Sequence, residues 1–461
     1  MARNSVYTGG GRKPCEALEI TFALFTSVSQ SNRLFNKGFS ALLITQLFGA
    51  VNDSVLKQVI ILAVASGGIW ANQLGDGGQA YVALCLTVPF ILLSGIAGQV
   101  ADRISKSRIT VIAKIAEVGI AALALGAFFA GNLWACLGAM VLLATQSAFF
   151  GPAKYGMIPE LVNEKHLSQA NGSINMFTNL AVIGGTLAAG KVYTSYSSGF
   201  PGGESGAPVD PAMLWIPGIV LVSIAIVGLL PSLLIPKLKS FDRSLPIDFN
   251  PFRPYVQAIK DMAQSHLLLV AMAWSFFYLL GMMALLVLSD FSGLLQISPE
   301  MNNNLLGVLG ITIGIGSVVA GLISGKHIEP RLIPVGAVGM TVFFVLLGLV
   351  PLSFWTVALL LGAAGLFAGF YIVPLQSLLQ HLSPPDERGR FLGTANALSF
   401  VFSTIGALLV RLLRNDLEMP ANRVFLVIGT LAILGSGVLL WKIRGLLVDP
   451  SLRKNTTADK S

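Results

Sequence analysis

An acid and a base stand four residues apart in an apolar stretch of this sequence. Within FGAVNDSVLKQVIILAV, Asp53 and Lys57 share one face of a helix, Gln46 lies on the same stripe, and Asn52 directly precedes the acid. A charge at the centre of a membrane helix costs about 2.5–3.5 kcal/mol, so neither side chain is expected to face lipid. Two interpretations stay open: an ion pair that fixes helix packing, or a contact for polar cargo or a gate that faces a wet cavity.

A second polar stripe follows further along the chain. Asn171, Asn175 and Thr178 recur at spacings of four and three residues, so their amide and hydroxyl groups share one helix face. These groups could bond neighbouring helices, at about 0.6 kcal/mol per hydrogen bond, or they could line a cavity.

Lys154 and Tyr155 follow a Gly-Pro pair in FFGPAKYGMIPELV. Because proline tends to end a helix, we expect this segment to be a loop at the cytoplasmic mouth of the protein. There the ammonium could anchor the chain at the membrane interface or contact a phosphate, and Glu160 is an alternative partner.

The segment GQVADRISKSR places an acid among basic residues. Such a cluster could be a conformational latch that is closed in one state and broken in another, or it could be an ordinary basic loop that sets membrane topology. The carboxylate of Asp102 could accept hydrogen bonds from a nearby Arg or lie at a helix N-terminus. The predicted latch residues here are Gly98, Asp102, Arg103, Lys106 and Arg108. Later loops add the predicted latch residues Lys326, Glu329, Arg331, Glu387 and Arg388.

The composition indicates which elements position these residues. The chain of 461 residues is 54% hydrophobic and only 11% charged, with a mean hydropathy of +0.75. A soluble domain carries about 25% charge, so the solvent of this chain is expected to be lipid. Its apolar runs are long and continuous, which predicts helices, because the backbone in lipid must satisfy its own hydrogen bonds. The net charge of +8 is explained by cytoplasmic loops, and we expect no nucleic-acid partner.

We therefore predict an all-α membrane protein with twelve transmembrane helices. The predicted spans are 40–66, 78–101, 109–130, 132–151, 168–190, 212–235, 266–290, 303–325, 332–352, 355–380, 390–411 and 422–443. The predicted domains are a cytoplasmic N-terminal tail (1–37), a six-helix bundle (38–235), a cytoplasmic linker (236–264), a second six-helix bundle (265–445) and a cytoplasmic C-terminal tail (446–461).

Basic residues give the orientation. With the N-terminus inside, 25 of the 30 Lys and Arg residues fall in inside segments, Lys154 among them, and four fall outside. This split predicts that both termini are cytoplasmic. The first residues lack a long apolar run and a cleavage site, so we expect no signal peptide.

Three sequence echoes link the two halves. Gly98 and Gly321 stand in similar loops 223 positions apart, Pro152 and Pro374 are 222 apart, and Asn171 and Asn396 in QANGSINMF and TANALSFVF are 225 apart. Three echoes in one order predict a duplicated six-helix unit. Two pseudo-symmetric halves with a binding site between them is the architecture of major facilitator transporters.

Enzymatic motifs are weak in this sequence. Its four histidines have no metal-ligand spacing, and GGTLAAGK lacks the strand and the final Ser/Thr of a phosphate loop. We interpret the string of His381 followed by Asp386 as chance. No metal, no cofactor and no enzymatic activity are expected.

Several blocks resemble the bacterial lysophospholipid transporter family of the major facilitator superfamily. They are ALLITQLFGAVNDSVLKQ, FFGPAKYGMIPELV, SQANGSINMFT, LISGKHIEPRLIPVGAVG and GFYIVPLQSLLQHLSPPDERGRFLGTANALS. The resemblance implies movement of lysophospholipids from the outer to the inner leaflet of the inner membrane, for re-acylation. It places Asn52, Asp53 and Lys57 on the first-helix motif, and Lys154 and Tyr155 on the motif after the fourth span.

This sequence departs from the family pattern at four positions. Val51 and Ser54 replace the usual Phe and Asn, Ser105 stands where the loop signature has Gly, and Asn175 replaces a common Glu, a change that bears on head-group choice. The chain ends at Ser461 without a synthetase domain, so a separate acyltransferase is the expected partner, beside membrane lipids. The rival functions are a proton-coupled exporter of small molecules that uses Asp53 and a membrane scaffold that transports nothing.

Overall fold

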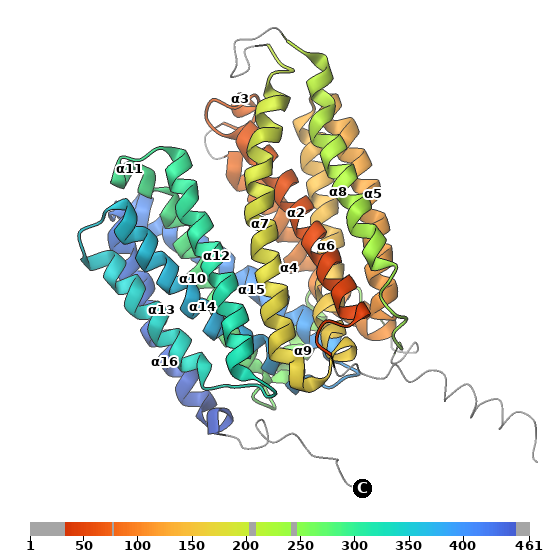
Figure 1. Cartoon of the computed structure of the whole chain (residues 1–461), viewed down its shortest axis with the longest axis vertical. Helices are drawn as coiled ribbons and strands as arrows, with labels where there is room; N and C mark the ends of the chain where they lie inside the picture. The colour runs from red at the N-terminus through yellow and green to blue at the C-terminus, as the bar shows by residue number, and fades with distance from the viewer. Residues whose placement is uncertain (1–32, 76–77, 202–208, 241–246, 449–461) are drawn as a thin grey trace, which may run out of the picture.

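The computed structural model describes residues 33–75, 78–201, 209–240 and 247–448 as a bundle of helices (Figure 1). In this part of the chain twelve long helices are present: α2 (Lys37–Val64), α4 (Gly78–Arg103), α5 (Lys106–Phe129), α6 (Leu133–Leu161), α7 (Leu167–Ser197), α8 (Ile216–Ser232), α10 (Leu267–Ser289), α12 (Pro299–Ser324), α13 (Leu332–Leu349), α14 (Phe354–Leu382), α15 (Arg388–Arg411) and α16 (Ala421–Val448). Each of the twelve predicted spans corresponds to one of them.

Short helical segments connect the long ones. They are α3 (Ala71–Leu74), η1 (Glu164–His166), η2 (Pro211–Trp215), α9 (Arg253–Met262), α11 (Phe291–Leu295) and η3 (Leu412–Asp416). Several long helices begin directly after a polar residue whose side chain accepts a hydrogen bond from the backbone of the first turn, as at Asn36, Asn132, Ser298 and Ser353. Such caps satisfy amides that the helix leaves without an internal partner.

Eleven of the twelve long helices in the described ranges are long and apolar enough to cross a membrane, and α7 is the exception. It has 31 residues, ample for a span, but its first turns carry the polar stripe that includes Asn171 and Asn175. Because α7 packs against α2 on one side and α12 on the other, this polar face lies in protein and not in lipid.

The helices form two bundles joined by a linker that contains α9. In Figure 1 the N-terminal half (α2 to α8) and the C-terminal half (α10 to α16) approach each other at the end where α9 lies and diverge towards α3 and α11. We call the first of these the linker end. Most of the predicted N-terminal tail and of the predicted C-terminal tail lies outside the described residues.

Two seams hold the halves together, α4 against α15 and α7 against α12. A Cβ at Gly98 would lie 2.5 Å from the carbonyl oxygen of Gly389, and a Cβ at Gly321 would lie 3.0 Å from Cα of Gln169. The two glycines occupy equivalent places in the repeat, and each allows a helix of one half to touch the backbone of the other half.

The prediction that the fourth span ends at 151 and is followed by a loop is wrong. Helix α6 continues to Leu161, with Pro152 and Pro159 inside it. A proline removes one backbone hydrogen bond, which a helix inside a membrane bundle tolerates when neighbours satisfy the freed group. The cytoplasmic loop assignment of Lys154 is therefore wrong as well, and so is that of Lys114, which the charge count placed with the preceding basic loop. Both are buried helical residues.

Candidate functional site

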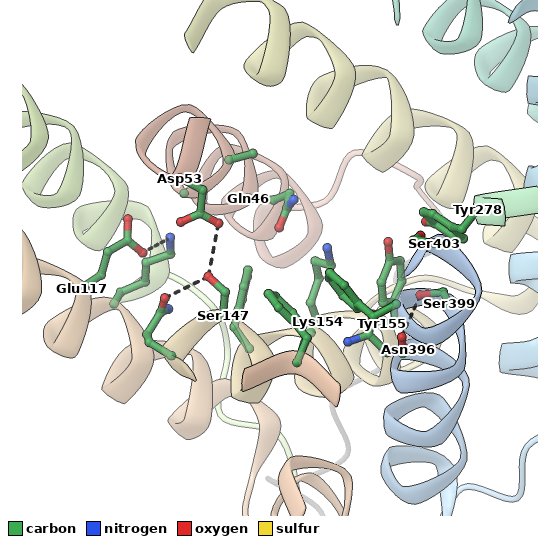
Figure 2. A pocket seen from close by; sticks show the side chains of 18 of the residues that line it. Gln46, Asp53, Glu117, Ser147, Lys154, Tyr155, Tyr278, Asn396, Ser399 and Ser403 are labelled. Carbon is green, nitrogen blue, oxygen red and sulfur yellow. Dashed lines mark hydrogen bonds and ion pairs between the residues drawn. The ribbon is translucent and has the colours of Figure 1, made fainter. Parts of the chain in front are cut away.

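A cavity of about 310 Å³ lies between the two halves (Figure 2). Helices α2, α4, α5 and α6 form its wall on one side, and α10 and α15 form the other. Its apolar wall consists of Phe90, Phe150, Tyr155, Tyr278, Met282 and Phe400. Charged and amide groups complete the lining, so the cavity suits a molecule with one polar and one apolar part.

The first-helix motif contributes Asp53 to the cavity wall. Its Oδ2 accepts a hydrogen bond of 3.2 Å from the hydroxyl of Ser147, whereas Oδ1 is buried without a hydrogen-bond partner among the described residues. Gln46 also lines the wall and donates a hydrogen bond of 3.1 Å to Thr178. Lys57 forms no ion pair with Asp53 in the described structure and is absent from the lining, so the aspartate turns to α6 instead.

A buried ion pair stands behind this aspartate. Nζ of Lys114 and Oε2 of Glu117 are 2.6 Å apart, and both side chains are 1% exposed. Asn52 donates a hydrogen bond of 3.1 Å to the other carboxylate oxygen, and the missing side chain at Gly49 leaves room for the ammonium. The sequence analysis did not single out Lys114 and Glu117, although a charge pair inside an apolar run was the signal that identified Asp53.

Lys154 supplies a positive charge to the cavity. It is 8% exposed, and its Nζ lies 4.3 Å from the ring centroid of Tyr155 and 5.9 Å from that of Phe150. Within the described ranges it makes neither an ion pair nor a hydrogen bond. The two rings hold the ammonium through cation–π contacts and leave its donors available to a ligand.

The polar groups that the C-terminal half contributes to the lining are all neutral. They are Tyr278 of α10 and Asn396, Ser399 and Ser403 of α15. Figure 2 shows the α15 side chains beyond Lys154 and Tyr155, across the cavity from Asp53. Single serines and asparagines on an apolar helix give little signal in a sequence, because only packing decides whether they meet a cavity.

Two members of the polar stripe of α7, Asn171 and Asn175, lie in the contact between the halves and not on the cavity wall, whereas Thr178 bonds Gln46 of its own half. Asn171 donates a hydrogen bond of 2.8 Å to Gln380 of α14 and accepts one of 3.0 Å from it. One turn along, Asn175 donates a hydrogen bond of 2.9 Å to Gln376. We call these two amide pairs the amide clamp. Because the clamp joins α7 to α14, it must break when the halves separate at the linker end.

Asp102 joins the halves along the other seam. Its Oδ1 accepts a hydrogen bond of 2.6 Å from the backbone N–H of Gly389, and its Oδ2 accepts one of 2.8 Å from that of Arg390. These amides belong to the first turn of α15, where the helix dipole also favours a negative charge. Gly98 lets α4 approach closely enough for this contact.

Of the other predicted residues of this loop, Lys106 forms an ion pair within its own half. Lys106 is 2.6 Å from Glu160 of α6, while Arg103 is half-buried and Arg108 is exposed. At the N-terminus of α15, Glu387 pairs with Arg390 at 2.8 Å. Arg388 donates a hydrogen bond of 3.4 Å to the carbonyl of Ser383.

The corresponding loop of the second half has no carboxylate at the position equivalent to Asp102, where Gly325 stands. Glu329 accepts a hydrogen bond of 3.4 Å from the backbone N–H of Arg331 in the same loop. Lys326 and Arg331 are exposed. Of the predicted latch residues, the structure therefore places Gly98 and Asp102 in the α4–α15 seam, against Gly389 and Arg390, and places Lys326, Glu329 and Arg331 outside that seam.

His381 forms an ion pair across the halves with Glu164 of η1. The hydrogen bond from this histidine lowers the pKa of Glu164. The sequence analysis attached no role to His381, because its partner lies more than 200 residues away along the chain.

Known proteins share this architecture. Residues 39–406 and 267–460 match the family model of the Major Facilitator Superfamily. The chain belongs to that superfamily. Among solved structures, the human organic anion transporter MFSD10 covers 87% of this chain and 99% of its own at 14% identity, with a TM-score of 0.70. The transporter FucP in its outward conformation covers 88% of this chain and 99% of its own at 12% identity, with a TM-score of 0.67.

Two curated lysophospholipid transporters are similar to this chain in sequence. The lysophospholipid transporter LplT of Cronobacter sakazakii is 27% identical over 384 residues, which cover 81% of this chain and 86% of the relative. The LplT of Photorhabdus laumondii is 27% identical over 361 residues, or 75% of this chain and 81% of the relative. This chain is a multi-pass membrane protein with a cavity between its halves.

Proposed function

We propose that this protein moves lysophospholipids from the outer to the inner leaflet of a bacterial inner membrane by alternating access, with both termini in the cytoplasm. Two relatives that align over three quarters or more of the chain carry the name lysophospholipid transporter. The excess of basic residues in the segments of the linker end supports the orientation. In this orientation the described conformation is closed towards the cytoplasm.

The observation that carries the cargo assignment is the lining of the cavity. Lys154 presents an ammonium without a counter-ion, and Asp53 presents a carboxylate oxygen without a donor, in a cavity that otherwise has aromatic and methionine walls. A lysophospholipid has a phosphate for the first group, a polar head for the second and one acyl chain for the apolar wall. At about 310 Å³ the cavity is at the small end of ligand sites, so it holds the head group and part of the chain.

The places where the halves touch support the proposed alternating access. In the described structure, the hydrogen bonds and ion pairs that join the halves include those of Asp102, the amide clamp, the Glu164–His381 pair and residues of the linker at the linker end, and the bond from Asn396 to Ser94 beside the cavity. We propose that these contacts break together when the cavity opens to the cytoplasm, as in other two-state transporters.

Flux in proteoliposomes tests the cargo. Vesicles with the purified protein should move labelled lysophosphatidylethanolamine between leaflets faster than empty vesicles do. Lys154→Gln should reduce this flux by about tenfold or more, because a charge-assisted contact to phosphate contributes about 1.5–3 kcal/mol. Lys326→Gln, which removes an exposed lysine far from the cavity, is the matched control and should leave the flux unchanged.

The same vesicles distinguish the rival functions. Flux of a cationic dye driven by a pH gradient, without lipid movement, would favour a proton-coupled exporter that uses Asp53. No flux of either kind would favour a scaffold. A separate acyltransferase is the proposed partner, and re-acylated lipid should appear only when such an enzyme is added to the inner-leaflet side.

A further inference from the structure

The linker helix α9 belongs to the C-terminal half by its packing. Its buried side chains, Pro254, Ala258 and Met262, face the bundle, and its neighbours in the C-terminal half are α10 and α15. At its last turn Asp261 lies 2.8 Å from the guanidinium of Arg390 at the start of α15. The backbone N–H of the same Arg390 donates a hydrogen bond to Asp102. The ion pair of Asp261 therefore anchors α9 beside the contact that Asp102 makes with α15.

At its first turn α9 reaches across to the N-terminal half. The hydroxyl of Tyr255 donates a hydrogen bond of 2.6 Å to the carbonyl of Ile91 and accepts one of 2.8 Å from the N–H of Gly95. Both partners lie inside the membrane-spanning helix α4. Burial raises the pKa of Tyr255 to about 12, so the hydroxyl keeps the proton that it donates.

The shape of α4 fits this ring. A Cβ at Gly95 would lie 2.7 Å from Cε1 of Tyr255, closer than atoms that are not bonded normally approach. One turn further, the side chain of Gln99 accepts a hydrogen bond of 2.9 Å from the backbone N–H of Asp248 and donates one of 3.2 Å to its carbonyl. The segment before α9 and α9 itself therefore hold α4 at two consecutive turns.

Tyr255 contacts one face of α4 at Ile91 and Gly95. At the same height along the helix, the other face of α4 packs against α15 in the seam. Ser94, which is fully buried, accepts a hydrogen bond of 3.1 Å from Asn396, and Phe90 stacks on Phe400 with ring centroids 4.1 Å apart. Phe90, Asn396 and Phe400 also line the cavity. The tyrosine of the linker thus contacts the stretch of α4 that closes the cavity at the linker end.

We propose that residues 247–262 are a strap that holds the α4–α15 seam closed, with Tyr255 as a positioning residue that must leave α4 before the cavity opens at the linker end. The strap is anchored on α15 through Asp261 and hooked on α4 through Tyr255 and Gln99. The α7–α12 seam has no such cover among the described residues. The strap would control opening of the linker end in the same way for any cargo. The proposal therefore rests on the proposed alternating access and does not depend on the cargo being a lysophospholipid.

A buried reporter in the seam tests the strap. With the native Cys15, Cys85 and Cys136 replaced by alanine, a Ser94→Cys reporter is labelled by a maleimide only when α4 and α15 separate. Tyr255→Phe should raise the labelling rate about fivefold, because two hydrogen bonds that favour the closed state are lost. Gly95→Ala should raise it as well, since the added methyl group displaces the ring while the hydroxyl is retained.

Two controls decide whether the effect belongs to the strap. Tyr193→Phe removes a tyrosine hydroxyl that bonds Ile69 within the N-terminal half, and it should leave the labelling of the reporter unchanged. A Ser275→Cys reporter, buried within α10, should stay unlabelled in every variant. The proposal is overturned if Tyr255→Phe and Gly95→Ala label like the parent, or if both reporters gain label together, because the tyrosine would then support general stability alone.

Discussion

Replacing Asp102 by asparagine should weaken the closed state of the linker end by a calculable amount. The carboxylate is 3% exposed and accepts backbone hydrogen bonds of 2.6 and 2.8 Å from the first turn of α15. Charge-assisted hydrogen bonds contribute about 1.5–3 kcal/mol each, and a favourable position at a helix N-terminus adds up to about 2 kcal/mol. Asparagine keeps one acceptor oxygen but loses the charge, so we expect a net loss of about 2–3 kcal/mol.

That loss corresponds to a shift of roughly 30- to 150-fold in the ratio of closed to open molecules. If the parent protein is about 99% closed, the variant should populate both states to a similar extent. Pulsed electron spin resonance between labels at Arg108 and Lys326 measures the two populations. Both side chains are exposed, one lies in each half at the linker end, and neither forms a contact between the halves in the described structure.

The matched control is Asp290→Asn. This aspartate accepts a hydrogen bond of 2.6 Å from Arg414 within the C-terminal half, far from the linker end, so its loss should not change the distance distribution. A single, unchanged short distance in Asp102→Asn would refute the reasoning, because it would mean that the aspartate contributes nothing to closure. A change that is equal in both variants would assign the effect to lost stability.

Three further predictions concern the buried Lys114–Glu117 ion pair, the amide clamp and the exposed Glu164–His381 pair. Glu117→Gln should lower the stability of the protein by about 3–5 kcal/mol in thermal unfolding, because it leaves a buried ammonium without its partner, and a normal melting temperature would contradict this. Gln380→Leu should remove both hydrogen bonds to Asn171 and favour the open state by about two- to tenfold in the same spin-label assay. Because His381 lowers the pKa of Glu164, their contact should add full stability to the closed state above the ordinary carboxyl pKa of about 4.3, and that contribution should fade as the pH drops through the lowered value. Glu164→Gln should abolish this pH dependence.

The fold could be predicted from the sequence because it depends on features that can be read from the sequence itself. Long apolar runs identify helices in lipid, and the three echoes identify the repeat, because both depend on local composition. The echo between Asn171 and Asn396 has a structural counterpart. The first bonds Gln380 and the second bonds Ser94, each in the opposite half.

The site was predicted less completely, for reasons that differ between residues. The proline in GPAKYG suggested a loop, but tertiary packing keeps α6 helical and turns Lys154 into the cavity. Lys114 and Glu117 gave the same local signal as Asp53 and could have been found from the sequence. Tyr255 could not, because its partners on α4 are brought to it only by the docking of the linker.

The distribution of charge between the halves explains how such a cavity can change access within a membrane. The charged groups of the lining are Asp53, Lys114, Glu117 and Lys154. All four belong to the N-terminal half, and the described residues that they contact lie in that half as well. Separation of the halves therefore breaks no ion pair inside the cavity, which would be costly at low dielectric. The groups that part at the linker end are the Asp102 carboxylate with its backbone amides, neutral side chains and one exposed histidine–glutamate pair, which water can solvate once the seam opens. An ion pair between the two halves across the cavity would stabilise the closed state so strongly that the halves could not separate readily. Because the C-terminal half lines the cavity with neutral groups, no such ion pair forms among the described residues.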